Sequence, residues 1–162
     1  MKKNIFLGLG SNIEERVTYL NTATSLIGSC SYIKIVQSSL IYETEPWGIR
    51  NQKRFLNKVL SLESSLPPED LLTFVKEVEI KTGRTESARW HEREIDIDVL
   101  FYDNEIISSD KFGLPHKEIQ NRKFVLIPMC EIAADFIHPV LNKSMKQLLE
   151  ESKDISEVKI YT

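Results

Sequence analysis

The segment 94–100 constrains this chain most, because it places two aspartates inside an apolar run. Side chains of a β-strand alternate between the two faces of a sheet, so Asp96 and Asp98 share one face with Cα atoms about 6.5–7 Å apart. Ile95 and Ile97 then point to the opposite face, toward a core. Two carboxylates this close repel each other unless a cation lies between them, and oxygen ligands suit Mg²⁺. The segment therefore predicts a strand with one buried face and one metal-binding face.

The aspartate pair also has a plain structural explanation, since acidic residues often cover a solvated sheet face. Arg84, Arg89 and Arg93 precede the pair and favour the metal interpretation, because guanidinium groups bind phosphate oxygens through paired hydrogen bonds. Trp90 adds an aromatic surface between them. Carboxylates, guanidiniums and an aromatic ring together indicate a polyphosphate and a planar ring as ligands.

The bulk properties are those of an ordinary globular protein. The chain has 162 residues, of which 41% are hydrophobic and 28% charged, so we expect a single domain over residues 1–162. A net charge of −3 argues against a nucleic-acid partner. The apolar run after Met1 is too short for a signal peptide or a membrane span. Cys30 and Cys130 lie far apart in the chain, without the spacing of a metal site, and are expected to be reduced thiols. We expect a cytoplasmic monomer without nucleic-acid or membrane partners.

The order of the expected elements favours an α+β fold. Four strands are expected, at residues 4–9, 32–42, 55–63 and 95–102. One helix is expected to begin near Ser11 or Asn12, and a second to run from Pro67 to Gly83. The order β-α-β-β-α-β matches the ferredoxin-like pattern, an antiparallel sheet with both helices on one face, here with C-terminal additions. A doubly wound parallel sheet fits less well, because residues 32–63 hold two strands without an intervening helix.

Two short features remain ambiguous by residue type alone. Residues 8–12, Gly-Leu-Gly-Ser-Asn, are expected to form a tight turn from the first strand into the first helix. A phosphate-binding loop is the alternative, but the segment lacks the lysine and the spacing of a P-loop. Asn57 lies inside an otherwise apolar strand, and a buried amide needs hydrogen-bond partners. Those partners are either backbone groups or the polar edge of a heterocycle.

Six segments, in chain order, resemble the 6-hydroxymethyl-7,8-dihydropterin pyrophosphokinases of folate biosynthesis. They are Gly8–Asn12, Glu43–Gly48, Phe55–Asn57, Glu79 with Gly83–Arg84, Arg89–Asp98 and Pro115–Phe124. The Arg-x-x-Asp-x-Asp core is the most specific of them, and the resemblance covers residues 4 to about 140. That family is ferredoxin-like and is an ATP-dependent diphosphotransferase. It moves a pyrophosphoryl group from Mg-ATP to the pterin hydroxymethyl oxygen and releases AMP. The resemblance implies ATP as co-substrate and two Mg²⁺ ions.

The resemblance also implies roles for individual residues. Asp96 and Asp98 would bind the metal ions and, with Arg84 and Arg93, form the catalytic set. Residues implied in pterin binding are Thr44, Glu45, Trp47, Phe55, Asn57, Trp90, Asp96 and Phe124, with Phe55 and Phe124 on the two faces of the ring. Residues implied in ATP binding are Glu79, Arg84, Trp90, Arg93, Val99, Lys111, His116, Lys117 and Arg122, with Glu79 on the sugar side.

Several positions depart from the family pattern. His91 stands where a small residue is usual, Glu45 where proline is common, and Phe55 where tyrosine is common. Glu86 lies where some members place another arginine, and Lys117 replaces a frequent aromatic beside the histidine. These departures concern the closing of loops and the grip on ATP, and they leave the aspartate pair intact.

Two other functions stay open on the residues alone. A Mg-dependent nucleotidyl transferase or phosphodiester-cleaving enzyme would also need paired acids and arginines, and it would cleave ATP to AMP without a pterin. A ferredoxin-like regulatory module would bind a small ligand and consume no ATP. The ordered set of motifs favours the pyrophosphokinase over both.

Overall fold

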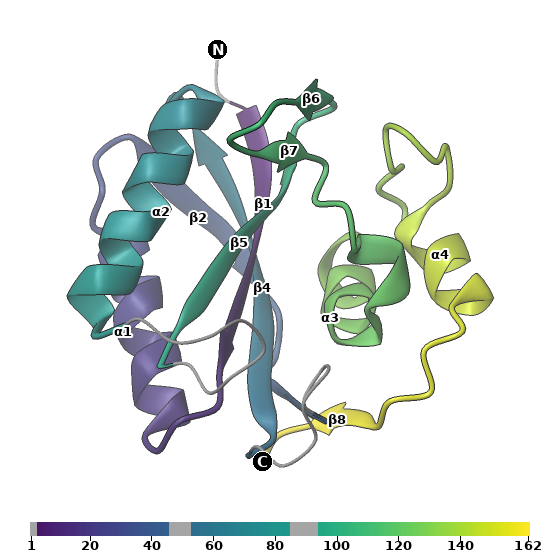
Figure 1. The fold of residues 1–162 in the computed structure, drawn as a ribbon, viewed down its shortest axis with the longest axis horizontal. Helices are drawn as coiled ribbons and strands as arrows, with labels where there is room; N and C mark the ends of the chain where they lie inside the picture. The colour runs from purple at the N-terminus through teal and green to yellow at the C-terminus, as the bar shows by residue number, and fades with distance from the viewer. Residues whose placement is uncertain (1–2, 46–52, 85–93) are drawn as a thin grey trace.

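An antiparallel sheet forms the centre of the computed structural model, which describes residues 3–45, 53–84 and 94–162 (Figure 1). The strands of this sheet are β1 (Lys3–Ser11), β2 (Ile33–Ser38), β3 (Tyr42–Thr44), β4 (Phe55–Ser64), β5 (Asp96–Tyr102) and β8 (Val158–Ile160). Their order is β5-β1-β4-β3-β8, with β2 also paired to β4, and every pair is antiparallel. The antiparallel sheet and the mixture of helices and strands are therefore confirmed.

The strand expected at 32–42 is two strands that share one side of β4. Strand β2 pairs with residues 60–64 of β4, and β3 pairs with residues 55–57. Between them, the Ser39 amide donates to the Val59 carbonyl at 2.9 Å, and the Ser39 hydroxyl accepts from the Val59 amide at 2.9 Å. These side-chain and backbone bonds replace regular pairing and let the chain change register. The element order over the first 102 residues is thus β-α-β-β-β-α-β.

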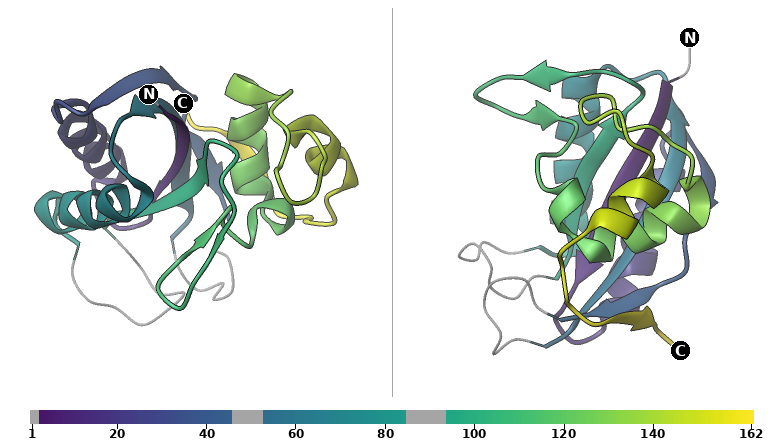
Figure 2. Two further views of the ribbon diagram at one scale, coloured as in Figure 1. Left: turned by 90° about the horizontal axis from the view of Figure 1, so that it is seen from above. Right: turned by 90° about the vertical axis from the view of Figure 1, so that its right-hand side faces the viewer.

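Helices cover both faces of the sheet. Helices α1 (Arg16–Gly28) and α2 (Pro68–Thr82) lie on one face, while α3 (Lys123–Ala133) and α4 (Met145–Glu151) lie on the other (Figures 1 and 2). A short ribbon, β6 (Ile107–Ser108) with β7 (Gly113–Leu114), and a single 3₁₀ turn, Ile119–Asn121, connect β5 to α3. No helix of the described ranges combines the length and the apolar character needed to cross a membrane.

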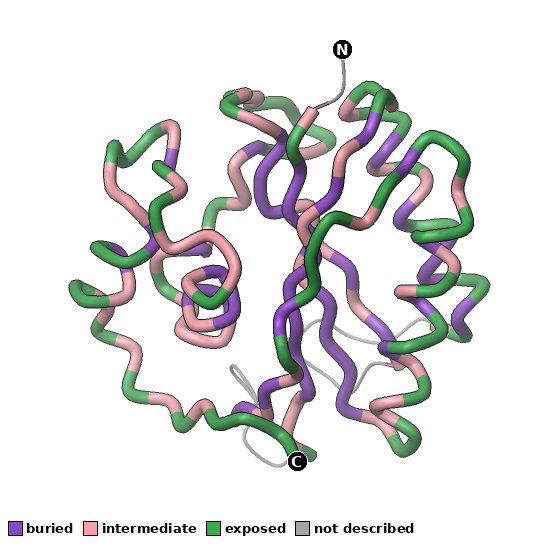
Figure 3. The backbone as a smooth tube through the Cα atoms, turned by 180° about the vertical axis from the view of Figure 1, so that it is seen from behind, coloured by how far each residue is buried: buried purple, intermediate pink, exposed green. Residues whose placement is uncertain are grey.

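Each face of the sheet has its own apolar core. The core under α1 and α2 includes Ile5, Leu7, Leu9, Leu20, Leu60, Leu71 and Ile97. The core under α3 and α4 includes Phe6, Val59, Leu100, Phe101, Leu126 and Met129. Figure 3 shows the resulting line of buried residues along the central strands. Alternating side chains of the same strands thus supply both cores.

The start of the first helix differs from the expectation. Strand β1 continues to Ser11, because Gly10 and Ser11 pair with Asn57 and Leu56 of β4, so residues 8–12 are not a turn. Helix α1 begins only at Arg16, after Glu15 at φ 70°, and no side chain caps it. Capping by Ser11 or Asn12 is therefore wrong. The second helix agrees with its expectation: it ends at Thr82, and Gly83 has a φ of 120° that favours glycine.

Candidate active site

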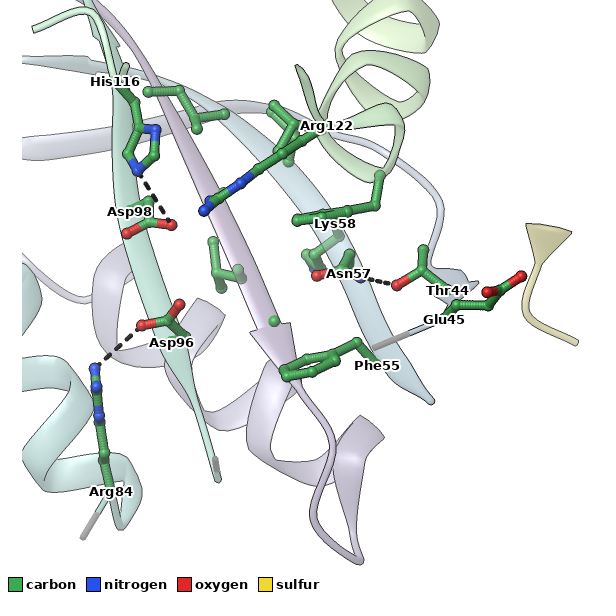
Figure 4. A pocket seen from close by; sticks show the side chains of 17 residues that line it. Thr44, Glu45, Phe55, Asn57, Lys58, Arg84, Asp96, Asp98, His116 and Arg122 are labelled. Carbon is green, nitrogen blue, oxygen red and sulfur yellow. Dashed lines mark hydrogen bonds and ion pairs between the residues drawn. The ribbon is translucent and has the colours of Figure 1, made fainter. Parts of the chain in front are cut away.

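A cavity opens on the face of the sheet that carries α3, above β1, β4 and β5 (Figure 4). Its floor is β1, where Gly10 lies between Asn57 of β4 and Asp96 of β5, and Gly8 lies beside Asp98. A Cβ atom on Gly10 would come within 2.7 Å of the Asn57 Oδ1. The two glycines therefore leave open space between the carboxylates on one side and the amide on the other.

Strand β5 supplies the acidic wall of the cavity. Asp96 and Asp98 both point into it, and their side chains are 38% and 37% exposed (Figure 4). Partial burial and the charge of Asp96 raise the pKa of Asp98 above its ordinary value. A divalent cation would relieve this repulsion, and the ligand atoms are the oxygens that Mg²⁺ prefers. The described residues hold no group of three or more metal-binding side chains, so substrate and water oxygens would complete the coordination.

Arg84 joins this acidic wall to a buried carboxylate at the end of α2. Its Nη1 lies 3.1 Å from the Asp96 Oδ1 and 2.5 Å from the Glu79 Oε2. The same Glu79 oxygen accepts a hydrogen bond from the Ile97 amide at 2.9 Å, and the Glu79 side chain is only 6% exposed. Glu79 thus lies beneath Arg84 and does not line the cavity. This position differs from the expected contact with the sugar of the nucleotide.

His116 and Arg122 enter the cavity from the side opposite Arg84 (Figure 4). Burial and the positive charge of Arg122 lower the pKa of His116 to about 4, so its imidazole is neutral at pH 7. The His116 Nδ1 accepts a hydrogen bond from the Glu118 amide at 3.2 Å, which assigns the proton to Nε2. That Nε2 lies 3.9 Å from the Asp98 Oδ2. His116 therefore presents a neutral N–H donor beside the carboxylates.

The wall facing the carboxylates is polar at its base and aromatic above. The Asn57 Nδ2 donates to the Thr44 Oγ1 at 2.7 Å, and both side chains are buried. This bond fixes the orientation of the amide and directs the Asn57 Oδ1 toward the space above Gly10. Glu45, Phe55 of β4 and Phe124 of α3 also line the cavity. The structure therefore places every described residue of the expected pterin set in one cavity.

A second hollow adjoins the first at the edge of the sheet. It is bounded by α2, β5 and the β6–β7 ribbon, and it includes Val99, Lys111 and Lys117 from the expected ATP set. Asp98 and His116 line both hollows. The described residues of the expected ATP set are thus divided: Arg84 and Arg122 line the first hollow, and Val99, Lys111 and Lys117 line the second. His116 lines both hollows, and Glu79 lines neither. The two hollows meet at the acidic wall.

Some site residues were not expected, and others cannot be placed. Gly8 and Gly10 form the floor, although the sequence pattern favoured a turn. Lys58 also lines the cavity, is buried, and has a pKa lowered by that burial. A lysine within the apolar run 55–60 was the available signal for it. Trp47, Trp90 and Arg93 lie outside the described residues, as do His91 and Glu86 among the departures from the family pattern.

The chain is similar to known proteins along most of its length. The sequence model of the 7,8-dihydro-6-hydroxymethylpterin-pyrophosphokinase (HPPK) family matches residues 6–134. The chain is 38% identical over 148 residues to a 2-amino-4-hydroxy-6-hydroxymethyldihydropteridine pyrophosphokinase of Aquifex aeolicus, a match that covers 91% of each chain. It is 37% identical over 132 residues to the enzyme of the same name from Bacillus subtilis, covering 82% of this chain and 79% of the relative.

Solved structures share the fold at lower identity. The HPPK-DHPS protein of Plasmodium falciparum, solved as wild type with STZ-DHP, superposes with a TM-score of 0.75 at 16% identity. The match covers 93% of this chain and 43% of that one, so this chain spans less than half of the solved protein. At this identity the likeness shows the fold alone.

Proposed function

The chain belongs to the 7,8-dihydro-6-hydroxymethylpterin-pyrophosphokinase family, and from that premise we propose how its described residues divide the reaction among them. The protein is an ATP-dependent diphosphotransferase of folate biosynthesis, which converts 6-hydroxymethyl-7,8-dihydropterin to its diphosphate and ATP to AMP. The observation that carries the assignment is one cavity with the aspartate pair on one wall and the Asn57 amide, flanked by aromatic rings, on the other.

The pterin lies against the Asn57 wall. A pterin ring is flat, with hydrogen-bond donors and acceptors along one edge and apolar faces. The fixed amide of Asn57, supported by Thr44, faces that edge, while Phe55 and Phe124 cover the two faces of the ring. The glycine floor supplies the depth for the ring, and Glu45 lies at the rim. This arrangement directs the hydroxymethyl group toward the acidic wall.

ATP lies across the acidic wall, with its phosphates toward the first hollow and its nucleoside toward the second. Arg84, Arg122 and the Nε2–H of His116 donate hydrogen bonds to phosphate oxygens. Val99, Lys111 and Lys117 border the nucleoside. Glu79 positions Arg84 through the 2.5 Å contact and keeps its guanidinium beside the phosphates.

Asp96 and Asp98 would hold two Mg²⁺ ions at the acidic wall. The ions, when bound, neutralise the phosphate charges and lower the pKa of the attacking hydroxyl group. The residues of the cavity then have mainly a positioning role, as phosphoryl transfer requires. The hydroxymethyl oxygen forms a bond to the β-phosphorus while the bond from that phosphorus to the α–β bridging oxygen breaks. AMP leaves with the electron pair, and the hydroxyl proton passes to solvent.

The order of the strands within the sheet also supports a ferredoxin-like fold, although the order of elements along the chain includes one extra strand. If β2 and β3 count as one interrupted strand, the order along the sheet is fourth, first, third and second, with α1 and α2 on one face. Both apolar cores share this sheet, which supports a single domain over residues 1–162. A monomer completes the proposal.

The deciding experiment is ³¹P NMR of the protein with Mg-ATP, recorded in the presence and in the absence of 6-hydroxymethyl-7,8-dihydropterin. Pterin-dependent appearance of AMP and a pterin diphosphate supports the proposal. AMP formation without pterin would indicate a nucleotide-cleaving enzyme, and ADP would indicate a simple kinase. Unchanged ATP would indicate a ligand-binding module. The variant Asn57→Ala tests the pterin wall: its affinity for the pterin should fall, while its affinity for an ATP analogue should persist.

A further inference from the structure

The segment Ser152–Ile160, here called the tail segment, runs from the end of α4 to the far edge of the sheet (Figures 1 and 2). It lies beyond residues 6–134, which the family model matches. The tail segment nevertheless contacts two parts of the chain that border the proposed pterin site. One contact is at the start of α3, which carries Phe124, and the other is along β3, which carries Thr44.

The contact at α3 is a helix cap supplied from a distance. The Asp154 Oδ2 accepts a hydrogen bond from the Lys123 amide at 2.9 Å, and Lys123 is the first residue of α3. Arg122, at the N-cap position, supplies no side-chain cap of its own. The other Asp154 oxygen accepts from the amide and the hydroxyl of Ser156, at 2.9 and 2.5 Å. These bonds fix the first turn of α3 and hence the backbone that carries Phe124.

The contact at β3 is strand pairing. Strand β8 pairs with all three residues of β3, with Val158 opposite Thr44 and Ile160 opposite Tyr42. Just before it, the Glu157 amide donates to the Glu45 Oε1 at 3.0 Å. Without β8, β3 would be a three-residue edge strand paired only with β4. The tail segment thus holds the strand whose Thr44 hydroxyl fixes the Asn57 amide.

We propose that the tail segment is a positioning element for the pterin: it fixes the separation and orientation of the α3 wall and the β3 wall between which the ring binds. This inference rests on the proposed function. The tail segment contributes little to the apolar core, because none of the residues 157–162 is buried. Its contacts are hydrogen bonds to α3, β3 and Glu45, and an ion pair between Glu157 and Arg54 at 3.3 Å. Loss of the tail segment should therefore reduce the affinity for the pterin far more than it reduces the stability of the fold or the affinity for ATP.

The test is a protein truncated after Ser156, which lacks Glu157 and β8 but retains the Asp154 cap. Pterin affinity is measured by its fluorescence in the presence of a non-hydrolysable ATP analogue, and the affinity for the analogue is measured separately. We expect the pterin Kd to rise about tenfold or more, because misplacing the site residues should weaken one or two hydrogen bonds to the pterin. The Kd for the analogue should change less than about twofold. Lys143→Ala is the control, since it removes only an exposed ion pair with Glu151 in the same part of the chain.

Two results would overturn the inference: unchanged affinity for both ligands in a folded truncated protein, or an equal loss of both affinities. If the truncated protein does not fold, Glu157→Pro and Glu157→Ala decide. Both remove the side chain, but only the proline removes the amide that donates to Glu45, so only Glu157→Pro should weaken pterin binding. Failure of the proposed function appears separately, as absent pterin binding in the unmodified protein. Hydrogen exchange of the Thr44 and Glu45 amides then still reports whether the tail segment holds β3.

Discussion

The two faces of the central sheet are made by the same strands and have different properties. On the face covered by α1 and α2, β1 presents Leu7 and Leu9, which are buried in a continuous apolar core. On the face covered by α3, the neighbouring residues Gly8 and Gly10 have no side chains and leave a cavity. Strand β5 shows the same division, with Ile97 on the first face and Asp98 on the second. Around the cavity, one strand therefore contributes to stability with one residue and to ligand binding with the next. Farther along the same strands, Phe6 and Leu100 supply a second apolar core on the α3 face.

This division implies that stability and activity can be altered separately within a single strand. Side chains on the α1 and α2 face are surrounded by apolar atoms, so their truncation leaves an empty volume. The side chains of Asp96, Asp98 and Asn57 on the α3 face border an open cavity, so their truncation removes charges or polar atoms that a ligand would contact. The following substitutions test the separation, and each could break it.

The largest effect should come from Leu7→Ala on the core face. Leu7 is fully buried, with Leu60 and Val99 as its cross-strand partners. We expect the free energy of unfolding in urea to fall by about 2–5 kcal/mol. The turnover number of the remaining folded protein should stay within about threefold, because the cavity is on the other face. A large loss of turnover with little loss of stability would show that the two faces are not independent.

Asp98→Ala should give the reverse result on the site face. Turnover at saturating Mg²⁺ should fall by at least about 10²-fold, as for the loss of one preorganised electrostatic group. The midpoint temperature of thermal unfolding in the absence of metal should not fall. The variant removes a carboxyl group whose pKa is raised by burial and by Asp96, which means that its ionised form is unfavourable in the folded protein. Asp135→Ala, at an exposed position, is the control. Near-normal turnover of Asp98→Ala would exclude the metal assignment.

Gly10→Ala tests the floor of the cavity. The added methyl group would lie 2.7 Å from the Asn57 Oδ1, so the amide must move. We expect the KM for the pterin to rise about tenfold, the effect of losing one well-placed polar contact, with a smaller change in the KM for ATP. Gly8→Ala is the matched comparison in the same strand, because the nearest atoms to its methyl group would be those of the Leu100 side chain, from 3.4 Å. Equal effects of the two alanines on the pterin KM would contradict the predicted role of Asn57.

The smallest effect should lie at the edge of the site face, in Asp154→Ala. Burial acts to raise the pKa of Asp154, but hydrogen bonds from Ser156 and the Lys123 amide outweigh it and hold the pKa below its ordinary value. A carboxyl group with a lowered folded-state pKa stabilises the protein above its unfolded pKa, and this stabilisation disappears as the pH falls through the folded value. At pH 7 the variant should be less stable by about 1 kcal/mol, as for loss of a helix cap.

The pH dependence supplies the check on the Asp154 prediction. The difference in urea unfolding free energy between the unmodified protein and Asp154→Ala should shrink as the pH falls below about 4, the ordinary value for aspartate. A difference that stays constant from pH 7 to pH 3 would show that Asp154 acts by packing and not by its charge.

The local patterns of the sequence were sufficient for some elements and not for others. The alternation of isoleucine and aspartate correctly placed Asp96 and Asp98 on one face, because strand periodicity is a local property. Proline and acidic residues at the start of α2 and Gly83 at its end were equally local signals. The start of α1 was misplaced, because pairing of Gly10 and Ser11 with β4 extends β1 through residues that favour a turn.

By itself, the sequence determined the family, the shared face of the two aspartates and the ends of α2. These depend on side chains within a few residues of each other or on an ordered set of motifs. Only the tertiary structure decided that Glu79 lies beneath Arg84, that Gly8 and Gly10 form a floor, and that the tail segment pairs with β3. The reason is that such contacts join residues far apart in the chain, and backbone pairing leaves little trace in the identity of the residues that pair. Asp96 and Asp98 could be found by counting, but their neighbours required the fold.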